Sequence, residues 1–300
     1  MKKKILVMGL GLIGGSLAMA LQGFEDYEVV GAVRSQGTYE KAVAMHAADR
    51  VTFDHVSELP EADVVILCQD PAGIVGFLQA HRDQFKPGAL IWDVCGVKTA
   101  VMAAAECLPE GVDFIGCHPM AGKEVSGIAN AEATLFRNTH FIVTPGPRAT
   151  PEHLALLHRM AEHCQFGDVI ETTPERHDEM IAYTSQLMHV IAVSVCDNDG
   201  LFSCKGFEGG SFRDCTRVAA LDADMWTQLF TLNAPALSKM VGRWKTGCTS
   251  TVWPSSPATR TRCGLCWPPR RGGRSRSTWS GPAATTCTPN FEIIDTGRSR

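Results

Sequence analysis

The stretch Ile5-Leu-Val-Met-Gly-Leu-Gly-Leu-Ile-Gly14 decides the fold of this chain. Its first four residues form a short apolar run, which is the pattern of a strand buried on both faces. The spacing Gly-x-Gly-x-x-Gly follows at once, and residues 16–21 continue as a helix. In this arrangement Gly9 makes a tight turn, Gly11 lets the backbone approach a pyrophosphate, and Gly14 lets the helix pack closely on the strand. A plain glycine turn is the alternative, but the order strand, glycines, helix predicts a dinucleotide site at the helix N-terminus.

Buried apolar runs recur through residues 1–145 and alternate with helical stretches. The expected strands are 5–8, 27–33, 63–68, 89–94, 114–116 and 141–144, and the expected helices are 16–21, 40–48, 72–84 and 99–107. This alternation predicts an α/β fold with a doubly wound parallel sheet of the Rossmann type. Ligands bind at the carboxyl ends of the strands in such sheets. The cofactor-binding residues expected there are Gly9, Gly11, Leu12, Ile13, Gly14, Arg34, Ser35, Gln69, Cys95 and Gly96.

The end of the second expected strand bears on the choice of dinucleotide. An acid at this position binds the ribose hydroxyls of NAD, but the chain has Val33 followed by Arg34 and Ser35. A guanidinium grips a phosphate through paired hydrogen bonds, which favours NADP. The alternative is that Arg34 is a solvated loop charge and that NAD still binds.

Composition limits the classes of protein that the chain can belong to. It has 300 residues, 45% of them hydrophobic, which suits two domains with packed cores. The formal net charge of −4 gives no reason to expect nucleic acid. No run approaches about 18 apolar residues and no export signal is evident, so neither a membrane span nor secretion is expected and the location predicted is cytoplasmic. The 12 cysteines are scattered and are interpreted as free thiols, and no metal site is expected.

The segment Ile115-Gly-Cys-His-Pro-Met-Ala-Gly-Lys-Glu-Val-Ser-Gly127 contains the candidate catalytic residue, His118. Glycines and a proline surround this histidine, so the backbone is expected to fix its position. A stray histidine in a surface loop is the alternative. The segment lies about one hundred residues after the glycine motif, where a nucleotide-binding domain usually ends, and this place favours a catalytic histidine.

Residues 146–245 are expected to form an all-helical second domain, with helices over 151–166, 174–197 and 222–233. The second helix carries a set of polar residues among apolar ones: His177, Asp178, Thr184, Ser185, Gln186 and His189. The set indicates a binding face, and the alternative is a solvated helix face or buried helix–helix hydrogen bonds. A second glycine-rich loop leads to Arg217, a candidate clamp for a carboxylate.

Five segments together resemble the prephenate dehydrogenase family of tyrosine biosynthesis. They are 9–14, 93–98, 116–127, 184–189 and 209–217, and the resemblance covers about residues 1–240. It implies oxidative decarboxylation of prephenate to 4-hydroxyphenylpyruvate with hydride transfer to NAD or NADP, in a homodimer formed by the helical domain. An arogenate dehydrogenase and a catalytically silent dinucleotide-binding protein are the alternatives.

The resemblance also implies roles for individual residues. His118 would accept the proton of the substrate hydroxyl, because its unperturbed pKa of about 6.5 suits a general base. Arg217 would bind a substrate carboxylate. The other residues implied at the substrate site are Gln186, His189, Glu124 and Asp214. The chain departs from the family at Cys95 and Gly96, where many members have Gly-Ser, and at Gln186, where many have histidine.

The last part of the chain, residues 246–300, differs in composition from the rest. Residues 1–245 hold 20 basic and 30 acidic residues, whereas 246–300 hold 8 arginines, no lysine and 2 acids. The segment is rich in Trp, Cys and Pro, which does not suit a helix. We interpret it as an aberrant basic tail translated out of frame. A nucleic-acid-binding tail is the alternative.

Overall fold

The computed structural model describes residues 2–252, 277–280 and 290–293. Two compact units, residues 1–238 and 239–300, are described separately. No helix in the described residues is long and apolar enough to cross a membrane. All nine cysteines that the structure describes are free thiols, as the sequence predicts.

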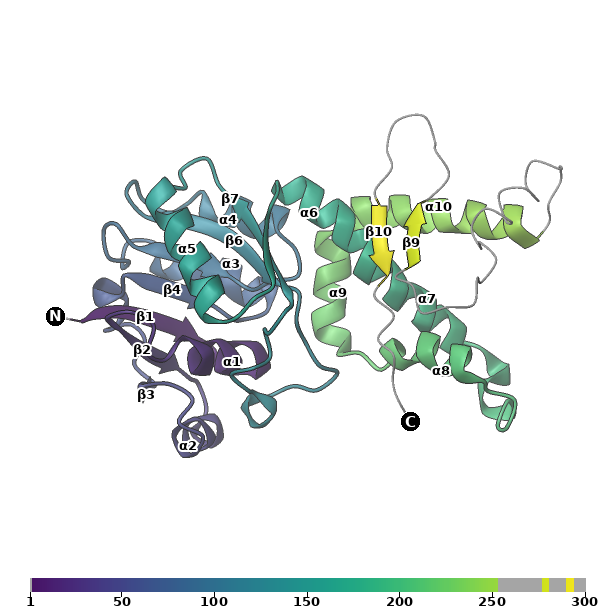
Figure 1. Ribbon diagram of the computed structural model, residues 1–300, viewed down its shortest axis with the longest axis horizontal. Coiled ribbons are helices and arrows are strands. Elements are labelled where there is room, and N and C mark those ends of the chain that lie inside the picture. The colour runs from purple at the N-terminus through teal and green to yellow at the C-terminus, as the bar shows by residue number, and fades with distance from the viewer. Residues whose placement is uncertain (1, 253–276, 281–289, 294–300) are drawn as a thin grey trace. The chain divides into compact units, whose positions relative to one another are not determined.

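The first unit contains an eight-stranded sheet in the order β3-β2-β1-β4-β5-β6-β7-β8 (Figure 1). The strands are β1 (Lys3–Met8), β2 (Tyr27–Ala32), β3 (Arg50–Thr52), β4 (Val64–Leu67), β5 (Leu90–Asp93), β6 (Asp113–Pro119), β7 (His140–Pro145) and β8 (Asp168–Glu171). All neighbouring strands pair in parallel except β6 and β7, which pair antiparallel. The predicted Rossmann-type fold is thus confirmed, with one antiparallel pairing that the sequence analysis did not anticipate.

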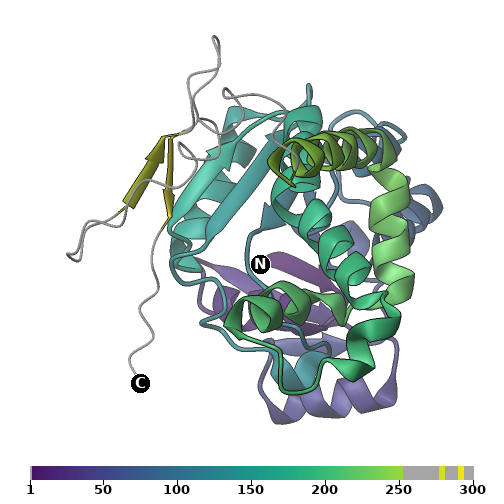
Figure 2. The same cartoon turned by 90° about the vertical axis from the view of Figure 1, so that its right-hand side faces the viewer.

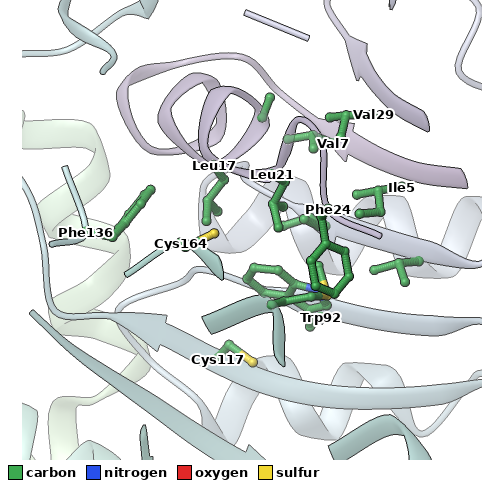
Figure 3. Close-up of a cluster of buried hydrophobic side chains, with 14 of the residues drawn as sticks. Ile5, Val7, Leu17, Leu21, Phe24, Val29, Trp92, Cys117, Phe136 and Cys164 are labelled. Atoms are coloured by element: carbon green, nitrogen blue, oxygen red, sulfur yellow. The ribbon is translucent and has the colours of Figure 1, made fainter. Parts of the chain in front are cut away.

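Helices cover both faces of the sheet. Those of this part are α1 (Leu12–Leu21), α2 (Gln36–Ala44), α3 (Pro71–His81), α4 (Thr99–Ala105) and α5 (Pro151–His163). On one face, α1 and α5 pack against the strands around Trp92, and Figure 3 shows Leu17 and Leu21 of α1 in this cluster. On the other face, Ile74 of α3 and Val101 of α4 belong to a second buried cluster. Burying both faces explains why the central strands are apolar without alternation.

The sheet extends past residue 145, the expected end of the first domain. Helix α5 contributes Leu157 and Met160 to the core of the sheet, and β8 pairs with β7 from His140↔Asp168 to Val143↔Glu171. Strand β8 is short and partly exposed, so it lacks the apolar run that marks the central strands. Residues 146–171 therefore lie with the nucleotide-type sheet and not with the helical part, which begins at Pro174.

The helical part of the first unit contains α6 (Pro174–Ile181), α7 (Leu187–Cys196), α8 (Gly210–Thr216) and α9 (Ala223–Leu232). In Figure 2 these teal and green helices lie together in front of the sheet. The expected single helix 174–197 is divided by a π-helical turn, Ala182–Gln186. Such turns are frequent at functional sites.

Helix α10 (Ala234–Val252) continues past residue 246, where the tail was expected to begin. The change in composition therefore does not end the helix, because the first proline after it is Pro254. Beyond it the structure describes two short antiparallel strands, β9 (Ser277–Ser280) and β10 (Asn290–Ile293). The rest of the interpreted tail lies outside the described residues.

Candidate active site

The glycine loop after β1 has the geometry that its spacing predicts. Gly9 has φ +93°, a value that favours glycine, and its N–H donates to Ala32 O at 3.0 Å. A Cβ at Gly14 would lie 2.0 Å from Gly9 O, whereas a Cβ at Gly11 would meet nothing within 4 Å. Helix α1 starts at this loop with no side-chain cap. The result is a backbone cradle at a helix N-terminus, which fits an anionic group of a nucleotide.

A second feature at the same edge also fits a bound nucleotide. Gln69, in the loop after β4, has a buried Oε1 without a hydrogen-bond partner among the described residues. Buried polar atoms are normally paired, so an unpaired one in a loop at this edge suits a ligand contact. Arg34 is exposed with no ion pair in the described part, while Ser35 caps α2 by accepting from Thr38 N. Ser35 therefore has a structural role that the sequence analysis did not assign.

A buried ion pair links strands β5 and β6 and the start of helix α4. Asp93 and Lys98 are both fully buried, and the Lys98 ammonium donates to Asp93 Oδ2. The same carboxylate accepts the N–H of Cys95 at 2.8 Å and that of Cys117 at 3.1 Å. The pair thus joins the end of β5 to the start of α4 and to β6, the strand that carries His118.

His118 was expected in a glycine-rich loop, but it lies within strand β6. Its backbone is fixed by pairing with β7, where it stands opposite Ile142. Of the three glycines around it, Gly127 has positive φ, and it lies well beyond the strand. The regular strand, more than the glycines, therefore positions this histidine.

His118 begins a chain of hydrogen bonds that reaches into the helical part. Its Nδ1 lies 2.9 Å from His177 Nε2, and His177 Nδ1 lies 2.8 Å from Asp178 Oδ1. Asp178 in turn accepts the backbone N–H groups of Lys98 and Thr99, at 2.7 and 2.9 Å. Helix α6 is thereby tied to the N-terminus of α4.

Electrostatics favour the neutral form of both histidines. Burial, followed by the neighbouring His177 and Lys98, holds the pKa of His118 well below its usual value. Burial also lowers the pKa of His177, although the hydrogen bond to Asp178 opposes this. Burial raises the pKa of Asp178, but its hydrogen bonds outweigh burial and keep the pKa below the usual value. The arrangement is a neutral imidazole pair ending on a carboxylate.

The loop after β5 brings Gly96 next to His118. A Cβ at Gly96 would lie 3.9 Å from His118 Cε1 and 3.5 Å from a methyl of Leu229 on α9. The neighbouring Cys95 is buried, and burial raises the pKa of its thiol to about 12. Cys95 is therefore a neutral packing residue, and Gly96 is the residue that lies beside His118.

Arg217 and Glu124 form an ion pair between half-exposed side chains. Arg217 begins a short 3-10 turn after α8, and Glu124 lies in the loop that follows β6. The structure therefore brings together two of the expected substrate-site residues. Asp214 is exposed on α8, and no hydrogen bond or ion pair within the described residues joins it to this pair.

His189 is held by an aromatic neighbour from α9. Its ring stacks on Trp226 with centroids 3.7 Å apart, and its Nδ1 lies 3.0 Å from Ser185 O. A carbonyl only accepts, so Nδ1 carries a proton and Nε2 is left for another partner.

Gln186 was expected to bind the substrate, but its side chain forms hydrogen bonds within the protein. Its Nε2 donates to Leu229 O at 3.1 Å, and its Oε1 accepts from Asn233 Nδ2 at 2.8 Å. The side chain is buried. This geometry supports the alternative of buried helix–helix hydrogen bonding, because both ends of the amide are already used.

His177 and Asp178 were named from the sequence only as members of the polar set on the second helix, and Trp226 and Asn233 were given no role. The signal for His177 and Asp178 was present, because polar side chains on a helix that packs against a neighbour require hydrogen-bond partners where they are buried. Trp226 and Asn233 gave no such signal, since aromatic and amide side chains are ordinary on packed helices.

A glycine cradle at the carboxyl edge of a mainly parallel sheet defines the class of Rossmann-type nucleotide-binding proteins. Two family models narrow this class. Residues 17–169 match the one described as "Prephenate dehydrogenase, nucleotide-binding domain", and residues 173–252 match "Prephenate dehydrogenase, dimerization domain". The chain belongs to the prephenate dehydrogenase family, as the resemblance of its motifs indicated.

Individual relatives agree with this assignment. The prephenate dehydrogenase of Bacillus subtilis is 30% identical over 253 residues, which are 81% of this chain and 68% of that protein. The cyclohexadienyl dehydrogenase of Zymomonas mobilis is 33% identical over 244 residues, 78% of this chain and 82% of that protein.

Solved structures show the same fold. The arogenate dehydrogenase of Synechocystis superposes with a TM-score of 0.72 at 33% identity, covering 83% of this chain and 90% of that one. The prephenate dehydrogenase of A. aeolicus, in complex with hydroxyphenyl propionate and NAD+, superposes with a TM-score of 0.74 at 26% identity. The match covers 84% of this chain and 90% of that one.

Proposed function

We propose that this protein catalyses the oxidative decarboxylation of prephenate to 4-hydroxyphenylpyruvate with a nicotinamide dinucleotide as the hydride acceptor. The observation that carries the proposal is His118, a histidine of lowered pKa at the carboxyl edge of the sheet. Its Nδ1 is bonded to His177, and no hydrogen bond within the described residues engages its Nε2. A free imidazole nitrogen beside a nucleotide cradle is what removal of a hydroxyl proton requires.

The cradle and the loops around it would hold the dinucleotide. The backbone at Gly9 and Gly11 would take the pyrophosphate, and Gln69 would reach the cofactor with its unpaired Oε1. When bound, the nicotinamide supplies a hydride acceptor. We favour NADP, because exposed Arg34 is available for a 2′-phosphate and Val33 replaces the acid that would bind ribose.

His118 acts on the ring hydroxyl of prephenate in this mechanism. Its Nε2 accepts the hydroxyl proton while hydride leaves the same carbon, which becomes a carbonyl. Loss of the ring carboxylate as CO2 then sends an electron pair into the ring, and the resulting phenolate takes the proton back from His118. General-base assistance of this kind contributes roughly 10²–10⁴-fold to the rate.

Arg217 would bind a carboxylate of the substrate, and Glu124 would act as a gate. In the structure the Glu124 carboxylate pairs with this guanidinium. A substrate carboxylate can replace it, because both offer two oxygens to the planar guanidinium. His189, held by Trp226, would present its Nε2 to the substrate, while Gln186 would hold α7 against α9. Asp214 stays a proposed contributor to the gate from α8.

Arogenate is the second candidate substrate. It is favoured by the 33% identity to the arogenate dehydrogenase of Synechocystis. The two substrates share the ring hydroxyl and ring carboxylate, so His118 would have the same task in both. They differ in a side chain that carries either a keto group or an amine.

One experiment tests the proposal. The full chain is mixed with prephenate or arogenate and with NAD or NADP, and reduction of the dinucleotide is followed by its absorbance. We expect reduction with prephenate, faster with NADP, and a roughly 10²–10⁴-fold lower kcat in His118→Asn with unchanged dinucleotide affinity. Faster reduction with arogenate would assign the other substrate, and no reduction with either would leave a dinucleotide-binding protein.

We further propose that the protein forms a homodimer through its helical part. Residues 173–252 match a dimerization domain, and in this part Phe202 and Phe207 are 92% and 90% exposed. Light scattering should give twice the chain mass for the wild type and a shift toward monomer for Phe202→Ser/Phe207→Ser; a monomeric wild type would refute the proposal.

A further inference from the structure

The hydrogen-bond chain that ends on His118 has a direction set by its far end. Asp178 accepts the backbone N–H groups of Lys98 and Thr99, and backbone N–H groups can only donate. The carboxylate is therefore an acceptor, consistent with its lowered pKa. The hydrogen bond between this carboxylate and His177 Nδ1, at 2.8 Å, must therefore be donated by the imidazole. His177 thus carries its proton on Nδ1.

The next contact follows from the first. A neutral imidazole has one N–H, so a proton on His177 Nδ1 makes His177 Nε2 an acceptor. The group 2.9 Å away is His118 Nδ1, which must then be the donor. His118 in its neutral form is left with a lone pair on Nε2, the nitrogen that no partner in the described residues engages.

We propose that His177, backed by Asp178, is a positioning residue that holds His118 in the tautomer with its proton on Nδ1, so that Nε2 is the base. This inference rests on the proposed function, which gives His118 that task. His177 has no exposed side-chain surface, so it acts through His118 and not on the substrate.

The same chain stabilises the proton that His118 gains. After His118 accepts the hydroxyl proton, its Nδ1–H still donates to His177, whose ring is polarised by the Asp178 carboxylate. Loss of the correct tautomer in a comparable triad of another enzyme lowers kcat by about 10⁴-fold. The charged groups that face His118 are Asp178 on α6 and Lys98 at the start of α4.

The hydrogen-bond chain His118–His177–Asp178 also joins the two parts of the protein that the family models match. His118 lies within residues 17–169, and His177 and Asp178 lie within residues 173–252. The base is therefore complete only when α6 is docked on the N-terminus of α4.

Nitrogen-15 NMR of the histidine side chains tests the proposal directly, because the two ring nitrogens differ strongly in shift when only one is protonated. In the wild-type protein, His118 should show a protonated Nδ1 and an unprotonated Nε2. A protonated Nε2 in the neutral wild-type ring would overturn the proposal without any activity measurement.

Two substitutions at His177 separate positioning from packing. His177→Leu removes the acceptor, and we expect His118 to shift toward the Nε2–H tautomer and kcat to fall by roughly 10²–10⁴-fold with little change in dinucleotide affinity. His177→Gln keeps a carbonyl acceptor near the position of Nε2 and should restore the tautomer and most of the lost kcat. A glutamine variant as impaired as the leucine variant, or an unchanged tautomer in the leucine variant, would refute the role.

His153→Gln is the matched control. His153 Nδ1 lies 2.5 Å from Asp113 Oδ2, so it forms a similar His–Asp pair at the opposite end of β6. The His153→Gln substitution should leave kcat and the His118 tautomer unchanged. His118→Asn separates the two proposals: if it retains wild-type kcat, the proposed function fails, whereas if it is inactive and His177→Leu is not, only the positioning role fails.

Discussion

Replacing Gly14 by alanine tests how tightly the nucleotide cradle is built. The added Cβ would lie 2.0 Å from Gly9 O and 2.9 Å from Cys68 Cβ, so helix α1 or the glycine loop must move by about 1 Å. Overpacking of this kind costs about 1–3 kcal/mol, and a backbone oxygen as the neighbour places it near the upper end. The higher helix propensity of alanine offsets up to about 1 kcal/mol of this cost, so the free energy of unfolding should fall by about 2 kcal/mol. For a unit of 238 residues this lowers Tm by about 4–8 °C.

The same substitution should weaken dinucleotide binding by roughly 10²-fold, since a displacement of about 1 Å misplaces the backbone donors. Gly11→Ala is its matched control, because a Cβ there meets nothing within 4 Å. It should cost less than about 1 kcal/mol of stability and yet weaken binding, because the methyl group would stand where the pyrophosphate approaches. Calorimetry of unfolding and titration with NADP measure both quantities. A Gly14→Ala protein that melts with the wild type, or a Gly11→Ala protein with wild-type affinity, would refute the reasoning.

Three further predictions follow from charged groups of the site. Arg34→Ala should weaken NADP binding by about 10–100-fold and leave NAD binding unchanged, as measured by calorimetric titration, whereas an equal effect on both would contradict the 2′-phosphate contact. Glu124→Gln frees Arg217, so KM for prephenate should fall, by at most about fivefold because the ion pair is exposed; a raised KM would show that Glu124 helps to bind the substrate. The pKa of His118 is lowered by burial and by His177, so the acid limb of kcat/KM should lie below pH 6.5. The unfolded chain then binds more protons, and the free energy of unfolding should also decrease as pH falls below about 6.5; a limb at or above 6.5 would contradict the shift.

The fold could be predicted from the sequence as far as its signals are local. The glycine spacing and the apolar runs of β1, β4 and β5 each lie within a few residues, and they indicated the sheet. Strand β8 and helix α5 were assigned to the wrong part, because their membership depends on pairing with β7 and not on their own composition. The antiparallel direction of β7 is likewise a tertiary property.

The site could be predicted only in part. His118 and Arg217 were named from motifs and Glu124 from the family resemblance, each without the other, and the structure joins Arg217 and Glu124 in an ion pair. The hydrogen-bond chain His118–His177–Asp178 could not be predicted, because His118 and His177 are 59 residues apart in the sequence and meet only when α6 packs against the sheet part. Gln186 was expected at the substrate site, whereas its amide is hydrogen-bonded to Leu229 O of α9 and to Asn233 just after that helix, contacts that the sequence does not indicate.

The placement of His118 separates a rigid part of the site from a part that can open. The histidine is fixed by strand pairing opposite Ile142, by the buried Asp93–Lys98 pair beneath it and by His177 behind it. The Arg217–Glu124 pair is half-exposed and joins two loops, so exchange of its partner costs little. In the proposed mechanism, substrate binding can therefore be paired with movement of the Arg217–Glu124 gate, while His118 keeps its position and its proposed tautomer.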